Sequence, residues 1–173
     1  MCDKARSPSA WFTCNGGSYR RCNSETEADL PDMTPLKTRD CRWIGVPGAA
    51  DARGKINFLA FDAALGFQPR RLFWLHDIAP DQWRGRHGHR QSHLVTLVMN
   101  GSCRVHLDDS RVTETVTLDD PGRALHIGPF VWHELTHFTP GTVILVIAST
   151  LYDEGEYLRD YETFRREAAA RLA

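Results

Sequence analysis

The sequence predicts an all-β domain, a sandwich or small barrel of short strands, that is closed by a C-terminal helix. Between about residues 41 and 149, short apolar or alternating segments recur between turn residues, which is typical of such folds. Asn100-Gly101 stands between two of these segments and is a strong signal for a hairpin turn. From residue 153 onward the pattern changes to charged residues spaced four positions apart, which indicates a helix.

Residues 1–40 are predicted to be a flexible, disordered N-terminal tail. The segment contains turn-rich stretches such as 15–18 (NGGS) and shows neither helical nor strand periodicity. Met33 stands just ahead of the first patterned residues and is a candidate start of the native chain. The sequence therefore divides into a tail, 1–40, and one domain, 41–173.

Eight segments of this domain are predicted to be strands because apolar and β-branched residues are concentrated in them between turn signals. They are 55–60, 71–76, 93–99, 103–107, 113–118, 124–127, 131–137 and 143–148. Apolar and polar residues alternate in the fourth of these segments. Arg104 and His106 are therefore expected to face solvent.

Residues 153–173 form the predicted C-terminal helix. The pairs Glu162/Arg166 and Glu167/Arg171 each place an acid four residues ahead of a base, which is the order that stabilises a helix. We expect this helix to lie on the surface of the domain.

Composition and charge exclude several classes of protein. Hydrophobic residues make up 42% and charged residues 25% of the chain, as in ordinary globular proteins. No apolar run approaches the roughly 20 residues that a membrane helix needs. The formal charge of -1 provides no strong field for nucleic acid. Five cysteines without a CxxC pair are typical of a reducing compartment. We therefore expect a cytoplasmic protein that binds neither nucleic acid nor membrane.

Histidines are concentrated in the strand-rich part of the chain, where all eight lie between positions 76 and 137. His87, His89 and His93 share parity, so in one extended strand they would project from the same face. His133 and His137 would likewise share a face of a later strand. If both faces line a barrel, several imidazoles converge on one cavity.

Convergent imidazoles suit two chemistries. They can hold a divalent metal, or they can move protons, because an imidazole titrates near neutral pH. The alternative is that these histidines are core residues with all their hydrogen bonds made and have no chemical role. His126, like His106, alternates with apolar neighbours and is expected to face solvent. The positions of His76 and His137 are left open.

Four segments in order along the chain carry a resemblance to a known family. They are 84–90 (RGRHGHR), 101–109 (GSCRVHLDD), 128–134 (GPFVWHE) and 152–161 (YDEGEYLRDY). Together they look like the successive motifs of the WxcM-like cupins, the dTDP-4-keto-6-deoxyglucose 3,4-ketoisomerases of deoxysugar biosynthesis. The resemblance spans about residues 42–164. It implies a cupin jelly-roll barrel and a homodimer in which N-terminal strands can be exchanged between subunits.

The resemblance also implies roles for individual residues. His87 and His89 match the catalytic pair of the family, and Arg71 and Arg84 match its basic positions near the phosphates of the nucleotide sugar. Further substrate contacts are expected from His93, Trp132 and His133. For Trp132 the alternative is packing in the hydrophobic core.

Two positions depart from the family pattern. Phe73 stands where the family often has an aromatic hydroxyl, and His93 stands where it commonly has a carboxylate. The first departure removes a possible proton carrier. The second alters the charge expected around the catalytic pair.

The implied reaction moves a ketone from C4 to C3 of a nucleotide-linked hexose through an enediol and consumes no redox cofactor. We assign the carbon base to His89 and the partner role to His87 on the strength of the resemblance. We expect no cofactor and no metal in the active protein, because an imidazole bound to metal cannot accept a proton.

Two alternatives remain at this point. One is a metal-dependent cupin enzyme, a dioxygenase or isomerase, with His87, His89, His93 and His133 as ligands. The other is a noncatalytic sugar-binding cupin, which would keep the two arginines but would need no proton-transfer pair. Metal analysis tests the first, and hydrogen exchange into a substrate tests the second.

Overall fold

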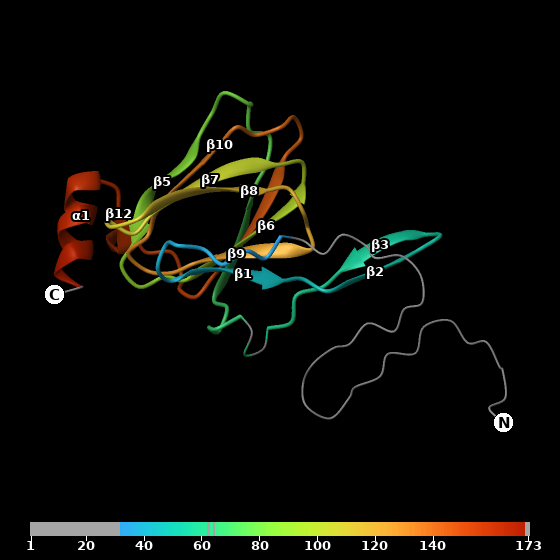
Figure 1. Cartoon of the computed structure of the whole chain (residues 1–173), viewed down its shortest axis with the longest axis horizontal. Coiled ribbons are helices and arrows are strands. Elements are labelled where there is room, and N and C mark those ends of the chain that lie inside the picture. Colours follow the sequence, from blue (N-terminus) through green and yellow to red (C-terminus); the bar gives the residue numbers. More distant parts are fainter. Residues whose placement is uncertain (1–31, 62, 64, 172–173) are drawn as a thin grey trace. The chain divides into compact units, whose positions relative to one another are not determined.

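The computed structural model describes residues 32–61, 63 and 65–171. Two five-stranded antiparallel sheets face each other, and a hairpin and one helix are attached to them (Figure 1). This is the double-sheet arrangement of a jelly roll, so the predicted all-β fold with a short C-terminal helix is confirmed.

The first sheet has the strand order β1-β9-β6-β11-β4. These strands are β1 (Cys41–Gly45), β9 (Arg123–Ile127), β6 (Leu94–Asn100), β11 (Val143–Ala148) and β4 (Arg71–Leu75). The second sheet has the order β12-β5-β10-β7-β8. Its strands are β12 (Tyr157–Leu158), β5 (Arg84–His89), β10 (Trp132–Thr136), β7 (Cys103–Asp108) and β8 (Thr113–Leu118). A separate hairpin joins β2 (Gly48–Asp51) to β3 (Gly54–Asn57).

Each of the eight predicted strands overlaps an observed one, whereas β1, β2, β5 and β12 were not predicted. The missed strand β5 (RGRHGH) contains no aliphatic residue, so it lacks the hydrophobic pattern on which the prediction relied. The turn at Asn100-Gly101 does form, with Gly101 at φ 72°. It was wrongly predicted to close a hairpin, because it leads from β6 in the first sheet to β7 in the second.

The predicted helix 153–173 is wrong over its first eight residues. Asp153 accepts a hydrogen bond from the Gly155 amide and caps a short 3₁₀ turn, η1 (Glu154–Glu156). The chain then pairs with β5 as β12, and the helix α1 (Tyr161–Ala170) begins only after Asp160, which accepts a bond from the Thr163 amide.

The expected pairs of charges along this helix are not the ones that form. Glu167 binds the guanidinium of Arg90, the residue after β5, with a nitrogen–oxygen distance of 2.9 Å. The guanidinium of Arg171 lies over the ring of Phe130. Glu167 and Arg171, which the four-residue spacing predicts to pair with each other, therefore contact residues outside the helix and hold α1 against the second sheet.

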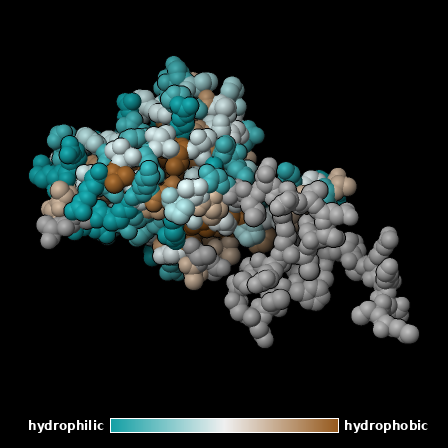
Figure 2. Space-filling model, in the orientation of Figure 1, coloured by the Kyte–Doolittle hydropathy of each residue, from teal (hydrophilic) through white to brown (hydrophobic). Residues whose placement is uncertain are grey.

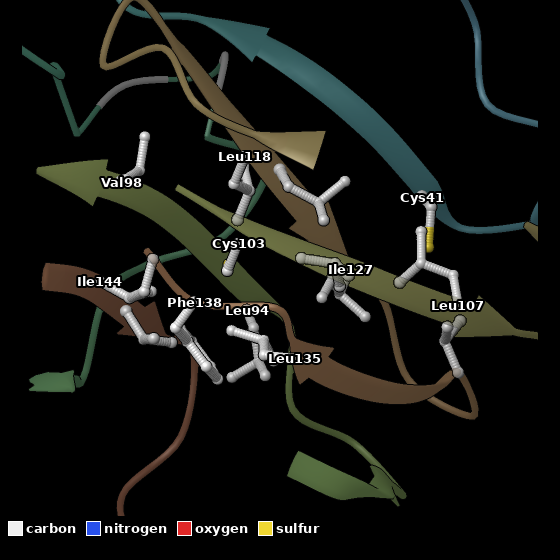
Figure 3. Packing of buried hydrophobic residues seen from close by; sticks show 14 of the residues in the cluster. Cys41, Leu94, Val98, Cys103, Leu107, Leu118, Ile127, Leu135, Phe138 and Ile144 are labelled. Atoms are coloured by element: carbon white, nitrogen blue, oxygen red, sulfur yellow. The ribbon is translucent and has the colours of Figure 1, made fainter. Parts of the chain in front are cut away.

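The main core lies between the two sheets, where apolar side chains of both meet (Figure 3). Val98 and Ile144 come from the first sheet, and Val105 and Leu135 come from the second. The face of the molecule in Figure 2 is mostly hydrophilic, with a few hydrophobic residues showing. In the part of the chain that the structure describes, no helix is long and apolar enough to cross a membrane.

A second apolar cluster covers the outer face of the first sheet. Val95 and Ala124 pack there against Leu65. His126 lies on the same face and is only 4% exposed, so its predicted exposure to solvent is wrong. The prediction failed because both edges of β9 are paired and the segment that carries Leu65 and Phe67 covers its outer face.

The predicted tail, 1–40, lies outside the described residues as far as residue 31. Beyond that point, the amides of Lys37 and Thr38 donate hydrogen bonds to the carboxylate of Glu114. The amide of Arg39 donates to Asp109. Residues 37–39 are thus held against the second sheet and the loop that follows β7.

Candidate functional site

Three histidines form a cluster on the interior face of the second sheet. His87 and His89 lie on β5, and His133 is paired with His87 from β10. The ring of His87 is 4.9 Å from that of His89 and 4.7 Å from that of His133, measured between centroids. The rings of His89 and His133 are 5.8 Å apart and nearly parallel. The predicted convergence of His87, His89 and His133 is therefore present in the structure.

An irregularity in β5 sets the face on which its side chains project. Gly85 is paired with Glu134 and Arg84 with Leu135, so Arg86 is one residue extra relative to β10. Gly85 and Arg86 have positive φ angles of 83° and 57°. A bulge of this kind re-aims the residues that follow it. Arg84 and His87, three positions apart, consequently share the interior face.

Glycine is required at the first position of this bulge. A Cβ atom on Gly85 would lie 2.6 Å from the carbonyl oxygen of His133 and 3.3 Å from its ring. Its φ of 83° is also in the region that side chains avoid. The glycine of the motif thus permits the backbone of β5 to approach His133 closely.

A C-terminal strap, residues 152–159, lies beside the histidine cluster. The ring of Tyr157 on β12 is 4.9 Å from that of His87 and 4.5 Å from that of His89. Within the same strap, the buried carboxylate of Glu156 has an oxygen 3.5 Å from Nδ1 of His89. The strap therefore supplies both an aromatic wall and a negative charge to the site.

Two arginines bring positive charge to the cluster. Arg71 of β4 lies over the rings of Phe73 and Tyr152, and its buried Nε finds no hydrogen-bond partner among the described residues. Arg159 of the strap pairs with Glu154 at 2.8 Å and lies over Tyr157. An unsatisfied guanidinium nitrogen is a donor available to an anion.

Burial and these charges keep the imidazoles neutral at physiological pH. The pKa of His89 is lowered to about 3, mainly by burial and in smaller part by the nearby His87, Arg71 and Arg159. Burial also lowers the pKa of His133 well below its ordinary value. For His87 burial lowers the pKa, while the Gly85 carbonyl that accepts from its Nδ1 acts in the opposite direction. Neutral imidazoles can accept a proton or bind a metal.

Because a carbonyl oxygen only accepts, Nδ1 of His87 must carry the hydrogen in its 3.0 Å bond to Gly85. Its Nε2 then holds the free lone pair. The structure therefore fixes a tautomer for His87 in which Nε2 is the basic nitrogen.

His93 does not join the cluster, although it was predicted to share a face with His87 and His89. β5 ends at His89, and the chain then crosses to β6 in the other sheet, so parity does not carry across the turn. On the outer face of the first sheet, Nδ1 of His93 lies 3.2 Å from Nε2 of His126 and its ring stacks on Phe67.

Trp132 also lies away from the cluster, which agrees with the core-packing alternative rather than with a substrate contact. Its ring packs against Tyr161 and Phe164 of α1, on the outer face of the second sheet. His137 does not share the face of His133, because β10 ends one residue before it and its φ of 54° turns the chain. Arg84 shares the interior face but is exposed, with its Nη1 bound to the Trp83 carbonyl.

Sequence reasoning missed the contributions of Glu156, Tyr157 and Arg159. The segment was assigned to a helix because of its charge spacing. Asp153 and Asp160, two capping residues seven positions apart, were the signal that it contains two separate helical starts.

Comparison with known proteins gives consistent results. A model of the family described as FdtA, WxcM-like, C-terminal, matches residues 39–169. The TDP-4-oxo-6-deoxy-alpha-D-glucose-3,4-oxoisomerase of Aneurinibacillus thermoaerophilus is 37% identical over 119 residues, which cover 69% of this chain and 86% of that protein.

Solved structures with the same fold include two ketoisomerases. The sugar 3,4-ketoisomerase QdtA from Thermoanaerobacterium thermosaccharolyticum, in complex with TDP, has a TM-score of 0.75 and 32% identity and covers 78% of this chain and 98% of its own. A histidine-to-asparagine mutant of QdtA has been solved in complex with TDP-4-keto-6-deoxyglucose. The WlaRB TDP-quinovose 3,4-ketoisomerase from Campylobacter jejuni has a TM-score of 0.71 and 32% identity, covering 74% of this chain and 98% of its own.

Proposed function

This chain belongs to the FdtA family, WxcM-like, C-terminal, and we propose on that basis that it is a sugar 3,4-ketoisomerase. Its substrate is a nucleotide-linked 4-keto-6-deoxyhexose, with TDP-4-keto-6-deoxyglucose as the compound to test first. The relatives support this substrate class, since QdtA is seen with TDP and, as a mutant, with that sugar. The observation that carries the proposal is the cluster of neutral imidazoles, His87, His89 and His133, in the family's motif positions.

The reaction is an internal exchange of hydrogen that leaves the composition of the sugar unchanged. The C4 carbonyl acidifies the hydrogen on C3, and a base removes that proton while O4 gains one, which gives an enediol. O3 then loses its proton, and C4 gains one, so the carbonyl moves to C3. Each step is a proton transfer, and well-placed acid–base groups accelerate such steps by about 10²–10⁴-fold each.

We assign removal of the C3 proton to His89 and proton transfer at the oxygens to His87. Part of what holds the pKa of His89 at about 3 is the positive charge of Arg71 and Arg159. A diphosphate bound by these guanidinium groups would offset that charge and raise the pKa of His89 toward the range useful for a base. Binding of the nucleotide thus activates the imidazole.

Arg71 is the better supported of the two predicted phosphate contacts, since its buried Nε has a donor to offer. Arg84 shares the face of His87 but stands at the exposed end of β5. We therefore assign it to the rim of the substrate site, where it would make a weaker contact with the phosphates. His133, fully enclosed beside both catalytic imidazoles, is assigned to contact with the sugar or with its neighbours in the proton path.

The experiment that tests the function is incubation of the purified protein with TDP-4-keto-6-deoxyglucose in D₂O, followed by NMR. We expect a 3-keto product that carries solvent deuterium at C4. His89→Asn and His87→Asn should each slow the conversion by at least about 100-fold and leave affinity for TDP within a few fold. His106→Asn, on β7 outside the cluster, is the matched control. Binding of the nucleotide sugar without deuterium uptake would indicate the noncatalytic alternative instead.

A metal-dependent enzyme is the second candidate, and one observation favours it. His87, His89 and His133 each offer a ligand nitrogen, and these nitrogens lie within 4.8 Å of one another. The fourth ligand expected for that alternative, His93, lies on the outer face of the other sheet. Metal analysis of protein purified without a histidine tag distinguishes the two candidates.

We also propose a cytoplasmic homodimer. Leu72 and Trp74 are 49% and 58% exposed on the outer face of β4, an edge strand, which supports burial of this face in a partner subunit. The buried thiols of Cys41 and Cys103 are unpaired, which fits a reducing compartment. Light scattering should give twice the chain mass of 19.6 kDa, and Trp74→Arg should lower it where the control Trp83→Arg does not.

A further inference from the structure

Glu156 is a buried carboxylate, 8% exposed, whose oxygens are held by several donors. Its Oε1 accepts a hydrogen bond from the amide of Gln91 at 2.6 Å. Its Oε2 accepts from the amide of Ser92 at 3.4 Å and from the hydroxyl of Ser92 at 3.1 Å. These donors follow directly on β5, so they fix the carboxylate relative to the strand that carries His87 and His89.

The carboxylate faces one further group. Its Oε2 lies 3.5 Å from Nδ1 of His89, and that buried nitrogen has no hydrogen-bond partner among the described residues, so this carboxylate is the acceptor that faces it. A carboxylate can only accept, so an imidazole beside it is stabilised with its hydrogen on the facing nitrogen. The lone pair of His89 is then on Nε2, the nitrogen away from Glu156.

We propose that Glu156 is a positioning residue for His89: it fixes the tautomer in which Nε2 is basic, and it stabilises the imidazolium that forms when Nε2 takes a proton. This inference rests on the proposed ketoisomerase function for its catalytic meaning. The same division of labour holds in other acid–base sites, where a buried carboxylate orients an imidazole without itself exchanging the proton. The ring of Tyr157, 4.5 Å from His89, flanks the imidazole of the pair.

Glu156→Gln is the test variant because it keeps the size of the side chain and removes the charge. A single amide oxygen cannot accept from both Gln91 and Ser92 while also facing His89. We expect the amide oxygen to stay with the Gln91 amide, so the NH₂ group turns toward Ser92 and His89. That NH₂ group donates to Nδ1, and the hydrogen of His89 moves to Nε2, which removes the base.

Two measurements on Glu156→Gln report this change. In ¹⁵N NMR of the free protein, the His89 signals should change from the Nδ1–H to the Nε2–H tautomer. In kinetics, kcat should fall by at least about 100-fold, while KM and the affinity for TDP stay within about threefold. Glu156→Asp retains a carboxylate and should keep the Nδ1–H tautomer and recover at least about tenfold of the lost kcat.

Glu167→Gln is the matched control, since it breaks the ion pair with Arg90, which directly precedes Gln91 and Ser92, without facing His89. It should keep the Nδ1–H tautomer and the kcat of the unmodified protein. The proposal is overturned if His89 stays Nδ1–H in Glu156→Gln, or if Glu167→Gln loses as much kcat. Because the tautomer is measured without substrate, it tests the contact even if the protein proves not to isomerise the sugar.

Discussion

The bulge in β5 depends on one glycine, and replacing it by alanine is a direct test of how the site is built. A Cβ on Gly85 would stand 2.6 Å from the carbonyl oxygen of His133, closer than a Cβ atom approaches its neighbours in folded proteins. Alanine at a positive φ costs about 1–2 kcal/mol, and the overlap with His133 adds roughly 1–3 kcal/mol of strain. We therefore expect Gly85→Ala to lower the free energy of unfolding by about 2–5 kcal/mol.

Gly141→Ala provides the matched control. Gly141 has a φ of 73°, close to the 83° of Gly85, but a Cβ there would meet only the Asn100 amide nitrogen at an ordinary 3.5 Å. This variant should lose only the backbone penalty of about 1–2 kcal/mol. The difference between the two variants isolates the clash with His133.

Urea denaturation monitored by circular dichroism measures both free energies, and the ketoisomerase assay follows the site. Gly85→Ala can relieve the overlap only by moving β5 away from β10, which separates His87 from His133. Its activity should fall by at least about tenfold even where the protein is fully folded, because catalytic groups tolerate little displacement. Equal destabilisation of the two variants with full activity in Gly85→Ala would refute this account of the bulge.

Three further outcomes are expected. Arg71→Ala should weaken TDP binding by about 1.5–3 kcal/mol in calorimetry, with a smaller loss for Arg84→Ala at the rim; unchanged binding in both would contradict their assignment to the phosphates. In the folded protein, burial lowers the pKa of His89 to about 3, that of His126 to about 4 and that of His133 well below its ordinary value. Below about pH 6.5 these histidines are therefore protonated in the unfolded chain but still neutral in the folded one. Stability should therefore be greatest above pH 6.5 and fall as the pH drops, by up to about 1.4 kcal/mol per unit for each histidine; a urea midpoint that is constant from pH 7.5 to 5 would argue against this. Zn²⁺ should inhibit the isomerase by taking up the imidazole lone pairs, and EDTA should leave activity intact; activity lost to EDTA and restored by one ion would favour the metalloenzyme.

The fold was predictable where apolar residues occupy one or both faces of a strand. The alternation in β7 (Cys103–Asp108) defines the buried face of that strand, and the apolar run of β11 (Val143–Ala148) fits a strand with apolar packing on both faces. β5 was missed because its interior residues are imidazoles, whose burial is stabilised by the strand ladder and by one another rather than by hydrophobic transfer. The hairpin predicted at Asn100-Gly101 failed because turn residues specify a reversal, not the sheet that the next strand joins.

The site was predictable in its imidazoles but not in its carboxylate. Parity placed His87 and His89 correctly, since both lie in one strand after the bulge. It failed for His93, because the chain leaves the sheet in between and parity is defined only within a strand. Glu156 could not be assigned from its own neighbourhood, since its partners, Gln91 and Ser92, are more than 60 residues away and meet it only after β12 has paired with β5.

The two departures from the family pattern have different consequences once the residues are placed. His93 lies on the outer face of the first sheet beside His126, so an imidazole there does not remove a charge from the catalytic pair. The carboxylate near that pair is Glu156, which reaches Nδ1 of His89 from the strap. Phe73 is different, because it lies on the interior face of β4 under the guanidinium of Arg71. A ring without a hydroxyl cannot carry a proton at that point. The proton transfers of the proposed reaction must therefore be accomplished from the opposite sheet, where β5, β10 and the strap bring the imidazoles together.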